Sequence, residues 1–286
     1  TRRTRQRPQR AGTRPSAAAV RRRSWAELSG GAIAAVVLAA GAAVLLSDSG
    51  GDRGSTGSSS PARLAAAVAP AHDAAPRRLS DPGGVSRYAF VERRVKVRAE
   101  PDAGARSLGR LGTRTADGTD ELVLALEGWT DRHGVRWMRV RTPLLPTGTV
   151  GWIPAAQLST LRRVRTWVLV DRGARRLTLR RDGRVVLRAP VGIGKAATPT
   201  PAGRFYIRDR LTGLDPRSLY GPEAFGTSAR SPTVTDWPGG SVVGIHGTNR
   251  PGLIPGRVSH GCIRLRNADI RRLARLMPVG TPVTVR

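Results

Sequence analysis

From residue 88 to the end of the chain, apolar and polar residues alternate in short runs that are separated by turn-forming clusters. Such runs place successive side chains on opposite faces of a strand, and the Gly, Pro and Asp-Gly clusters between them favour turns. Residues 270–277 instead carry apolar side chains at the helical spacing i, i+3, i+4 and i+7, with Asn267 at the expected N-cap and Pro278 just beyond. The sequence therefore predicts a mainly β protein with one late helix.

The β-patterned runs fall into two units, residues 88–160 and 161–286. The first unit contains the runs 95–98, 122–126, 137–141 and 150–153, which predict a small barrel or sandwich. The second contains the runs 166–171, 175–180, 184–188, 204–207, 241–245 and 281–285. A long Gly- and Pro-rich excursion, residues 209–240, interrupts the second unit. We therefore expect two β domains, the second of which carries the helix.

Residues 28–46 form a run of 19 residues without a charged side chain. About 20 apolar residues are needed for a helix to cross a bilayer. Nine arginines precede this run ahead of Glu27, whereas Asp48 and Asp52 follow it. This asymmetry predicts a single-pass membrane protein whose residues 1–27 form a cytoplasmic tail. A cleaved signal peptide would also place the rest of the chain outside the membrane, and a buried alanine-rich helix is the third interpretation.

Residues 47–87 join the expected membrane span to the first unit. They are rich in Gly, Ser, Ala and Pro and lack a periodic apolar pattern, which predicts a flexible linker. The formal net charge of +29 would suit a nucleic-acid binder, but no RNA- or DNA-binding motif accompanies it. Membrane topology explains the densest arginine block, so we expect no nucleic-acid partner.

Cys262 is the only cysteine of the chain. Exported proteins use cysteine mainly in disulfide pairs, so a single thiol outside the membrane is either incidental or kept for its reactivity. A thiol attacks a carbonyl as the thiolate, and a nearby imidazole can take its proton and return it to a leaving amine. His246, 16 residues earlier, and His260, two residues earlier, are both candidates for that base.

Glycine beside the cysteine favours an enzyme site over a structural one. Gly261 lets the backbone approach a bound carbonyl, so the amides of Gly261 and Cys262 are candidates for an oxyanion hole. Taken singly, a buried cysteine is usually a small hydrophobic residue and a histidine at a strand end usually caps a loop. A zinc site of one cysteine and two histidines lacks a fourth ligand. The combination predicts a Cys–His pair that needs no metal and no cofactor.

Four motifs of the first unit occur in a familiar order: Val97-Arg98-Ala-Glu-Pro101, Gly109-Arg-Leu-Gly112, Trp137-Met-Arg-Val140 and Gly151-Trp-Ile-Pro154. This order resembles the bacterial SH3-like (SH3b) family. The resemblance implies an SH3-like barrel over residues 88–160. Members of that family often bind cell-wall peptides, and a spacer without a ligand is the alternative.

Two motifs of the second unit, His246-Gly247-Thr248 and Ser259-His260-Gly261-Cys262-Ile263-Arg264-Leu265, follow the element Thr198-Pro-Thr-Pro-Ala-Gly203. They resemble the signature of the YkuD-type L,D-transpeptidase catalytic domain. The resemblance implies a β-sandwich catalytic domain over residues 161–286. It also implies an enzyme that accepts the third residue of a peptidoglycan tetrapeptide stem and expels the terminal D-Ala. The resulting thioester reacts with an amine of a neighbouring stem and gives a 3→3 cross-link.

The same resemblance assigns roles within the site. Cys262 corresponds to the nucleophile and His246 to the general base. His260 then orients the substrate or helps to shape the oxyanion pocket, together with Ser259 and Gly261.

Arg264 lies beside the candidate nucleophile, where it either holds a carboxylate of the stem or forms a structural salt bridge. The excursion at 209–240, with Tyr220 and Trp237, is where a lid over the donor is expected. Two alternatives to the transpeptidase stay open. One is an L,D-carboxypeptidase or hydrolase that uses water as the acceptor, and the other is a non-catalytic scaffold that binds the cell wall.

Overall fold

The computed structural model of the chain describes residues 72–81, 83–231, 233 and 241–286. Within these ranges, no helix is long and apolar enough to cross a membrane. The expected cytoplasmic tail, 1–27, and membrane span, 28–46, lie outside the described residues, as does the linker up to residue 71. These three assignments stay predictions.

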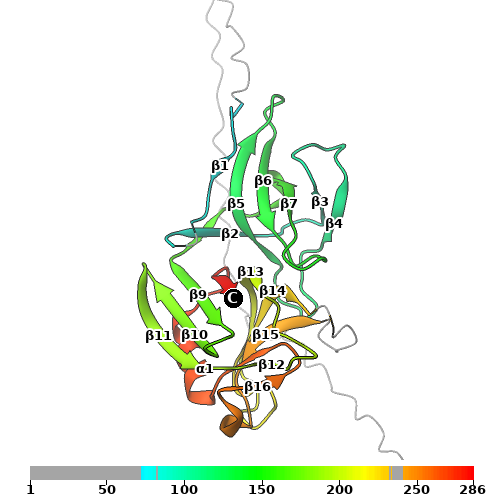
Figure 1. The fold of residues 1–286 in the computed structure, drawn as a ribbon. Helices are drawn as coiled ribbons and strands as arrows, with labels where there is room; N and C mark the ends of the chain where they lie inside the picture. The colour runs from blue at the N-terminus through cyan, green and yellow to red at the C-terminus, as the bar shows by residue number, and fades with distance from the viewer. Residues whose placement is uncertain (1–71, 82, 232, 234–240) are drawn as a thin grey trace, which may run out of the picture. The chain divides into compact units, whose positions relative to one another are not determined.

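The first part of the described chain folds into an eight-stranded sheet, the N-terminal sheet (Figure 1). Its strands are β1 (Arg77–Arg78), β2 (Ser86–Phe90), β3 (Val95–Arg98), β4 (Ser107–Leu111), β5 (Leu122–Thr130), β6 (Arg136–Arg141), β7 (Val150–Pro154) and β8 (Arg162–Val164). They are ordered β4-β3-β7-β6-β5-β2-β8, and β1 is added to β5. Each of the four runs that the sequence predicted in this unit lies within a strand. Alternate residues of β3 are buried, as their apolar–polar pattern requires.

The chain joins the N-terminal sheet earlier than the predicted linker boundary of 47–87 allows. Arg77 and Arg78 of β1 pair with Gly128 and Glu127 of β5. The N–H of Leu79 donates to the carbonyl of Leu126 at 2.8 Å, and the Leu79 side chain is buried. A strand of two arginines has no apolar alternation, so its pattern did not distinguish it from a linker.

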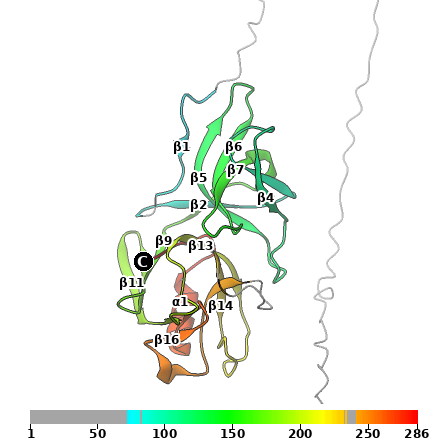
Figure 2. The same ribbon diagram turned by 45° about the vertical axis from the view of Figure 1, so that its right-hand side comes forward.

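The rest of the chain forms a ten-stranded sheet, the C-terminal sheet, with one α-helix. Its strands are β9 (Thr166–Asp171), β10 (Arg176–Arg181), β11 (Arg184–Pro190), β12 (Gly192–Gly194), β13 (Gly203–Leu211), β14 (Ala224–Arg230), β15 (Val242–His246), β16 (Gly256–Ser259), β17 (Ile263–Arg264) and β18 (Pro282–Val285). The order is β11-β10-β9-β18-β13-β14-β15-β17-β12-β16, so β11 is an edge strand, as both ribbon views show (Figures 1 and 2).

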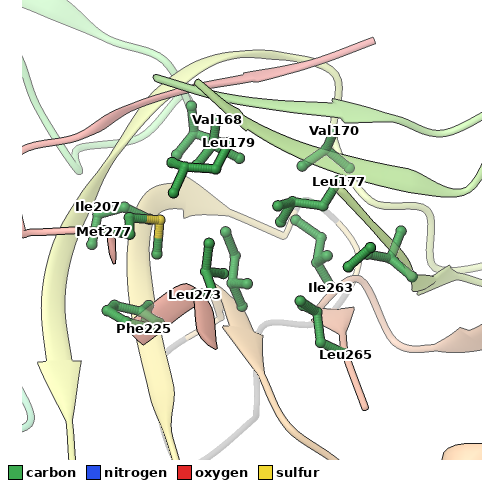
Figure 3. Packing of buried hydrophobic residues seen from close by; sticks show 14 of the residues in the cluster. Val168, Val170, Leu177, Leu179, Ile207, Phe225, Ile263, Leu265, Leu273 and Met277 are labelled. Carbon is green, nitrogen blue, oxygen red and sulfur yellow. The ribbon is translucent and has the colours of Figure 1, made fainter. Parts of the chain in front are cut away.

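Strand β13 belongs to both halves of the C-terminal sheet. Residues from Gly203 to Tyr206 pair with β18, whereas those from Ile207 to Leu211 pair with β14. One apolar core therefore joins the two halves and the helix α1 (Asn267–Leu276). Figure 3 shows Val168 and Leu179 of one half, Phe225 of the other, and Leu273 of α1 in this core. The mainly β fold with one late helix is thus confirmed.

The excursion at 209–240 is more regular than the sequence suggested. It holds the end of β13 and all of β14, which form an antiparallel pair. The sequence did not reveal β14 because Phe225 is followed by Gly226, Thr227, Ser228 and Ala229, which give no alternation of large apolar and polar side chains. Gly226 is required there, since a Cβ at this position would lie 2.2 Å from the Oδ1 of Asp209.

Two buried contacts join the N-terminal sheet to the C-terminal sheet. Arg208 of β13 forms an ion pair with Glu121, and its Nε donates to the Oε1 of Glu121 at 2.8 Å. The hydroxyl of Tyr206 donates to the carbonyl of Leu122 at 2.9 Å. Both partners on the N-terminal sheet are at or next to the start of β5. Because ionic and hydroxyl groups are buried only when they are paired, these contacts fix the docking of the two sheets.

Candidate active site

A short parallel strand pair brings Cys262 and His246 to one place. In this pair, Ile245 of β15 lies opposite Ile263 of β17, and His246 lies opposite Arg264. Cys262 immediately precedes β17, and its Sγ accepts a hydrogen bond from the N–H of Gly244 at 3.4 Å. The side chains of Cys262 and His246 line the same two cavities. The structure therefore places the two candidate catalytic residues together.

His246 is held in one tautomer. Its Nδ1 lies 2.7 Å from the carbonyl oxygen of Gly247, and a carbonyl accepts only, so Nδ1 carries the proton. The Nε2 atom is then the lone-pair acceptor. Burial lowers the pKa of His246 to about 4; the bond to Gly247 acts in the opposite direction, and the positive charge of Arg264 lowers the pKa further. At neutral pH the imidazole is thus uncharged and ready to take a proton.

Cys262 is also uncharged at neutral pH. Burial raises the pKa of its thiol, although the hydrogen bond from Gly244 and the charge of Arg264 act in the opposite direction. The resting pair is therefore a neutral thiol and a neutral imidazole rather than an ion pair. Burial disfavours both the thiolate of Cys262 and the imidazolium of His246. We therefore expect the thiol proton to pass to the imidazole as the sulfur attacks a carbonyl.

A tight turn fixes the backbone around Cys262. The hydroxyl of Ser259 donates to the carbonyl of Cys262 at 2.6 Å and accepts the N–H of Gly261 at 3.1 Å. Gly261 has a φ of +122°, a region that favours glycine. The amide of Gly261 is therefore engaged inside the turn, contrary to the expectation that it faces a bound carbonyl. Ser259 acts as the brace of the turn.

Thr200 also stabilises the turn around Cys262. It belongs to the motif at residues 198–203, but it was not among the predicted site residues. Its hydroxyl donates to the carbonyl of Gly261 at 2.8 Å and accepts the N–H of Gly194 at 2.9 Å. The side chain is 1% exposed. The fixed spacing of Thr200 within the Thr-Pro-Thr-Pro-Ala-Gly element is the signal that marks it. Thr200 ties the cysteine turn to β12, across 61 residues of sequence.

The smaller of the two cavities holds the cationic side of the site. It encloses about 490 Å³ including its open mouth, and Arg264 and His260 line it together with Cys262. The Nε of Arg264 is buried and has no hydrogen-bond partner among the residues that the structure describes. No ion pair of Arg264 is recorded within those ranges, which argues against the structural salt bridge. The guanidinium thus has donor capacity for an anionic group.

The larger cavity holds the acidic side. It encloses about 1240 Å³ including its open mouth, and Asp117 and Asp209 line it together with Cys262 and His246. Asp117 comes from the turn before β5, so the N-terminal sheet contributes to this cavity. Burial raises the pKa of Asp209, whose Oδ1 accepts the N–H of Gly226 at 2.8 Å. Apolar side chains form most of the remaining wall: Leu211, Leu214, Ala224, Phe225 and Val242.

Tyr220, the first of the two expected lid residues, lies against the candidate base. Its ring centroid is 4.9 Å from that of His246, with the planes tilted by 60°. The side chain contributes to the walls of both cavities that contain Cys262. Trp237, the second expected lid residue, lies outside the described residues.

Asn267 does not cap α1 as the sequence suggested. The N-cap of the helix is Arg266, and no side chain caps it. The Oδ1 of Asn267 instead accepts the N–H of Thr248 at 2.9 Å, and its Nδ2 donates to the carbonyl of Pro216 at 3.0 Å. Asn267 thus ties the turn after His246 to the segment before Tyr220. Local capping rules did not predict this use because both partners are distant in sequence.

No group of three or more His, Cys, Asp or Glu side chains with a metal-binding arrangement occurs in the described ranges. The side chains at the site are a thiol, two imidazoles and a guanidinium, flanked by carboxylates on one side. Together they can activate a thiol, stabilise an anion and bind a charged substrate.

Comparison with known proteins places the second unit in a family. The family model for the L,D-transpeptidase catalytic domain, YkuD, matches residues 165–285. The putative L,D-transpeptidase YkuD of Bacillus subtilis is 41% identical over 41% of this chain and 64% of its own length, so the chain spans just under two thirds of that relative. The putative L,D-transpeptidase YqjB of the same organism is 32% identical over 42% of this chain and 70% of its own length. The catalytic domain from the L,D-transpeptidase of E. faecium, solved by NMR, is 30% identical over 42% of this chain and 96% of its own, with a TM-score of 0.32.

Proposed function

Because the chain belongs to the YkuD-type L,D-transpeptidase family, we propose that it is a peptidoglycan L,D-transpeptidase that works through a thioester on Cys262. The observation that carries this proposal is that a neutral thiol, Cys262, and a neutral imidazole whose Nε2 is the acceptor, His246, line one cavity together with Arg264. Thiol, base and cation are the three groups that acyl transfer from an amide requires.

The first half-reaction releases an amine. As Sγ of Cys262 attacks the carbonyl carbon of the third stem residue, its proton passes to Nε2 of His246. The hydrogen bond from Nδ1 to Gly247 stabilises the imidazolium that forms. The tetrahedral oxyanion then collapses, the bond to the terminal D-Ala breaks, and His246 protonates the departing amine. The thioester and a neutral imidazole remain, so proton and charge balance.

Backbone and guanidinium groups are the proposed stabilisers of the oxyanion. Since the N–H of Gly261 is engaged by Ser259, the N–H of Cys262 is the remaining candidate of the two predicted amides. Arg264 lowers the pKa of the Cys262 thiol, and the same positive charge favours any anion that replaces the thiolate. His260 lines this cavity and is proposed to contact the donor stem rather than to act as the base.

The second half-reaction needs an amine, and the two cavities offer separate approaches to Cys262. The donor stem carries a terminal carboxylate, which suits the smaller cavity with Arg264. The incoming stem carries an ammonium group, which suits the larger cavity with Asp117 and Asp209. The ammonium first releases one proton to solvent, because only the neutral amine has a lone pair for the attack. As this amine attacks the thioester carbonyl, His246 takes its second proton and returns it to Sγ when the thioester bond breaks. The product is a 3→3 cross-link.

The remaining parts of the chain fit a position at the cell wall. We propose that the N-terminal sheet is an SH3-like (SH3b) domain that binds the wall, on the strength of its motif order. We also propose that residues 28–46 anchor the chain in the membrane, with the catalytic unit outside. This arrangement would keep Cys262 within reach of peptidoglycan stems.

The test is to incubate the full chain with purified disaccharide-tetrapeptide and to separate the products by mass spectrometry. The proposal predicts 3→3 dimers, which disappear in Cys262→Ala and in His246→Asn. His260→Asn is the matched control for the base: it should retain dimer formation with a raised KM for the donor.

Other outcomes point to the alternatives. Tripeptide monomers without dimers would identify a carboxypeptidase that uses water as the acceptor. No product, with equal binding of wild type and Cys262→Ala to cell-wall sacculi, would identify a scaffold and refute the enzyme.

A further inference from the structure

A cavity separate from those that contain Cys262 is lined by three arginines of the C-terminal sheet. It encloses about 520 Å³ including its open mouth, and the guanidinium groups belong to Arg172, Arg257 and Arg286. None of its described lining residues is acidic. The other lining residues are Gly173, Ile193, Gly194, Pro199 and Thr200. This arginine cavity is an electropositive hollow rather than a flat basic surface.

Arg172 is fixed in place and still has a donor to offer. Its Nη1 donates to the carbonyl of Thr200 at 3.0 Å, and its backbone N–H donates to the carbonyl of Arg286 at 2.8 Å. Its Nε is buried and has no hydrogen-bond partner within the described part of the chain. A buried donor without an acceptor is unfavourable. An oxyanion in the cavity would meet a guanidinium that its bond to the carbonyl of Thr200 already orients.

The charges nearby leave the cavity positive. Arg286 has one carboxylate partner, since its Nη2 lies 3.3 Å from the Oδ2 of Asp171. Arg257 is exposed, which leaves its guanidinium able to move toward a ligand. Among the described residues, Asp171 supplies the one carboxylate that pairs with these arginines, so three guanidinium groups exceed one carboxylate.

We propose that the arginine cavity binds a phosphate group. Guanidinium groups pair with oxyanions through parallel N–H donors, and a phosphate has enough oxygens to meet three such groups at once. A carboxylate has two oxygens and would satisfy fewer of them. The phosphate comes either from free inorganic phosphate or from a phosphodiester polymer. Each phosphodiester group has two charged oxygens and two weaker ester oxygens, and neighbouring groups along the polymer supply further charged oxygens to the arginines.

The position of the cavity gives its occupancy a consequence for the cysteine turn. Thr200 contacts Arg172 through its carbonyl and Gly261 through its hydroxyl, at 2.8 Å for the latter. A ligand that holds Arg172 in place therefore restrains the residue that braces the turn of Cys262. Binding at this cavity places the catalytic turn at a fixed distance from the phosphate group.

The test is a titration of the full chain with inorganic phosphate, followed by isothermal calorimetry at fixed ionic strength. Wild type is expected to bind saturably at one site. Arg257→Gln, an exposed position, should weaken binding about tenfold, the usual effect of losing one charge-assisted contact. Arg188→Gln is the matched control: it removes one exposed arginine of the same sheet that does not line the cavity, and it should leave the affinity unchanged.

Two further measurements identify the source of the phosphate group and test whether a loss of binding reflects misfolding. Arg172→Lys keeps the charge but lacks the planar guanidinium with its parallel donors, and it should weaken binding while melting at an unchanged temperature. A glycerol-phosphate oligomer that binds more tightly than inorganic phosphate points to the polymer; equal or weaker binding points to the free ion. The proposal would be overturned if Arg257→Gln and Arg188→Gln lost phosphate affinity equally, or if wild type showed no saturable binding. It would also be overturned if poly-glutamate of the same length as the glycerol-phosphate oligomer bound equally well.

Discussion

Replacing Glu121 by Gln is expected to destabilise the protein strongly, because it leaves Arg208 charged and buried. Side-chain exposures are 3% for Glu121 and 10% for Arg208, so water cannot take the place of the lost carboxylate. Gln keeps the shape and the acceptor oxygen that bonds the N–H of Leu122. The substitution therefore isolates the charge. Breaking a buried ion pair costs about 3–5 kcal/mol, a large part of the ~5–15 kcal/mol that keeps a protein folded.

The assay is urea unfolding followed by tryptophan fluorescence and by near-UV circular dichroism. Glu127→Gln is the control, since Glu127 pairs with Arg139 on the same sheet but the side chains are 29% and 45% exposed. That variant should lose no more than about 1 kcal/mol. The double variant Glu121→Gln/Arg208→Met should recover much of the loss, because no buried charge is then left alone. Equal, small losses in Glu121→Gln and Glu127→Gln would show that the two sheets do not dock through this pair.

Three further predictions concern single residues. Because the pKa of His246 is lowered to about 4, the acid limb of kcat/KM should lie near pH 4, and an acid limb near pH 6.5 would contradict the neutral pair. The unfolding free energy of wild type relative to His246→Asn should also drop by roughly 3 kcal/mol as pH falls from 6.5 toward 4, because the unfolded state takes up the proton first. Thr200→Val leaves the N–H of Gly194 and the carbonyl of Gly261 unpaired, so the acylation rate measured by stopped flow should fall about tenfold while donor binding persists. An unchanged acylation rate would show that Thr200 does not position the turn of Cys262. Gly280→Ala should lower the melting temperature, since its Cβ would lie 2.2 Å from the ring of Tyr88 and its φ is +78°; calorimetry showing no shift would contradict that packing.

The sequence identified the candidate catalytic residues because they lie in short motifs, residues 246–248 and 259–265. Spacing alone made His246 and His260 both candidates for the base beside Cys262, and the resemblance to the YkuD-type family assigned that role to His246. The spacing did not show how the fold brings Cys262 and His246 together. The structure does so through the parallel pairing of β15 with β17 and the hydrogen bond from the N–H of Gly244 to Sγ of Cys262. Nor did the spacing show that the N–H of Gly261 bonds to Ser259, since a hydroxyl two residues away competes with any ligand for that amide.

Features that depend on contacts between distant residues were not predicted. Glu121 and Arg208 are 87 residues apart, and nothing in either local pattern marks them as partners. Asn267 satisfies the rules for a helix cap, but it bonds to Thr248 and Pro216, which only the folded chain brings near. Tertiary contacts override local preference at such positions.

Strand prediction failed where apolar alternation was weak. β14 has one large buried apolar residue, Phe225, and the small residues 226–229 that follow it give no alternation that signals burial. β1 consists of two arginines, whose pairing with β5 depends on backbone hydrogen bonds alone. Backbone pairing leaves no trace in the pattern of side chains, whereas buried runs such as that of β9 do.

The most direct test of the account is the intact mass of the protein after rapid mixing with disaccharide-tetrapeptide and acid quenching. The account predicts a transient adduct equal to the stem without its terminal D-Ala, located on Cys262 by peptide mapping. The adduct should be absent in Cys262→Ser and should form much more slowly in His246→Asn. An adduct on any other residue, or turnover with no adduct and full activity in Cys262→Ser, would contradict it.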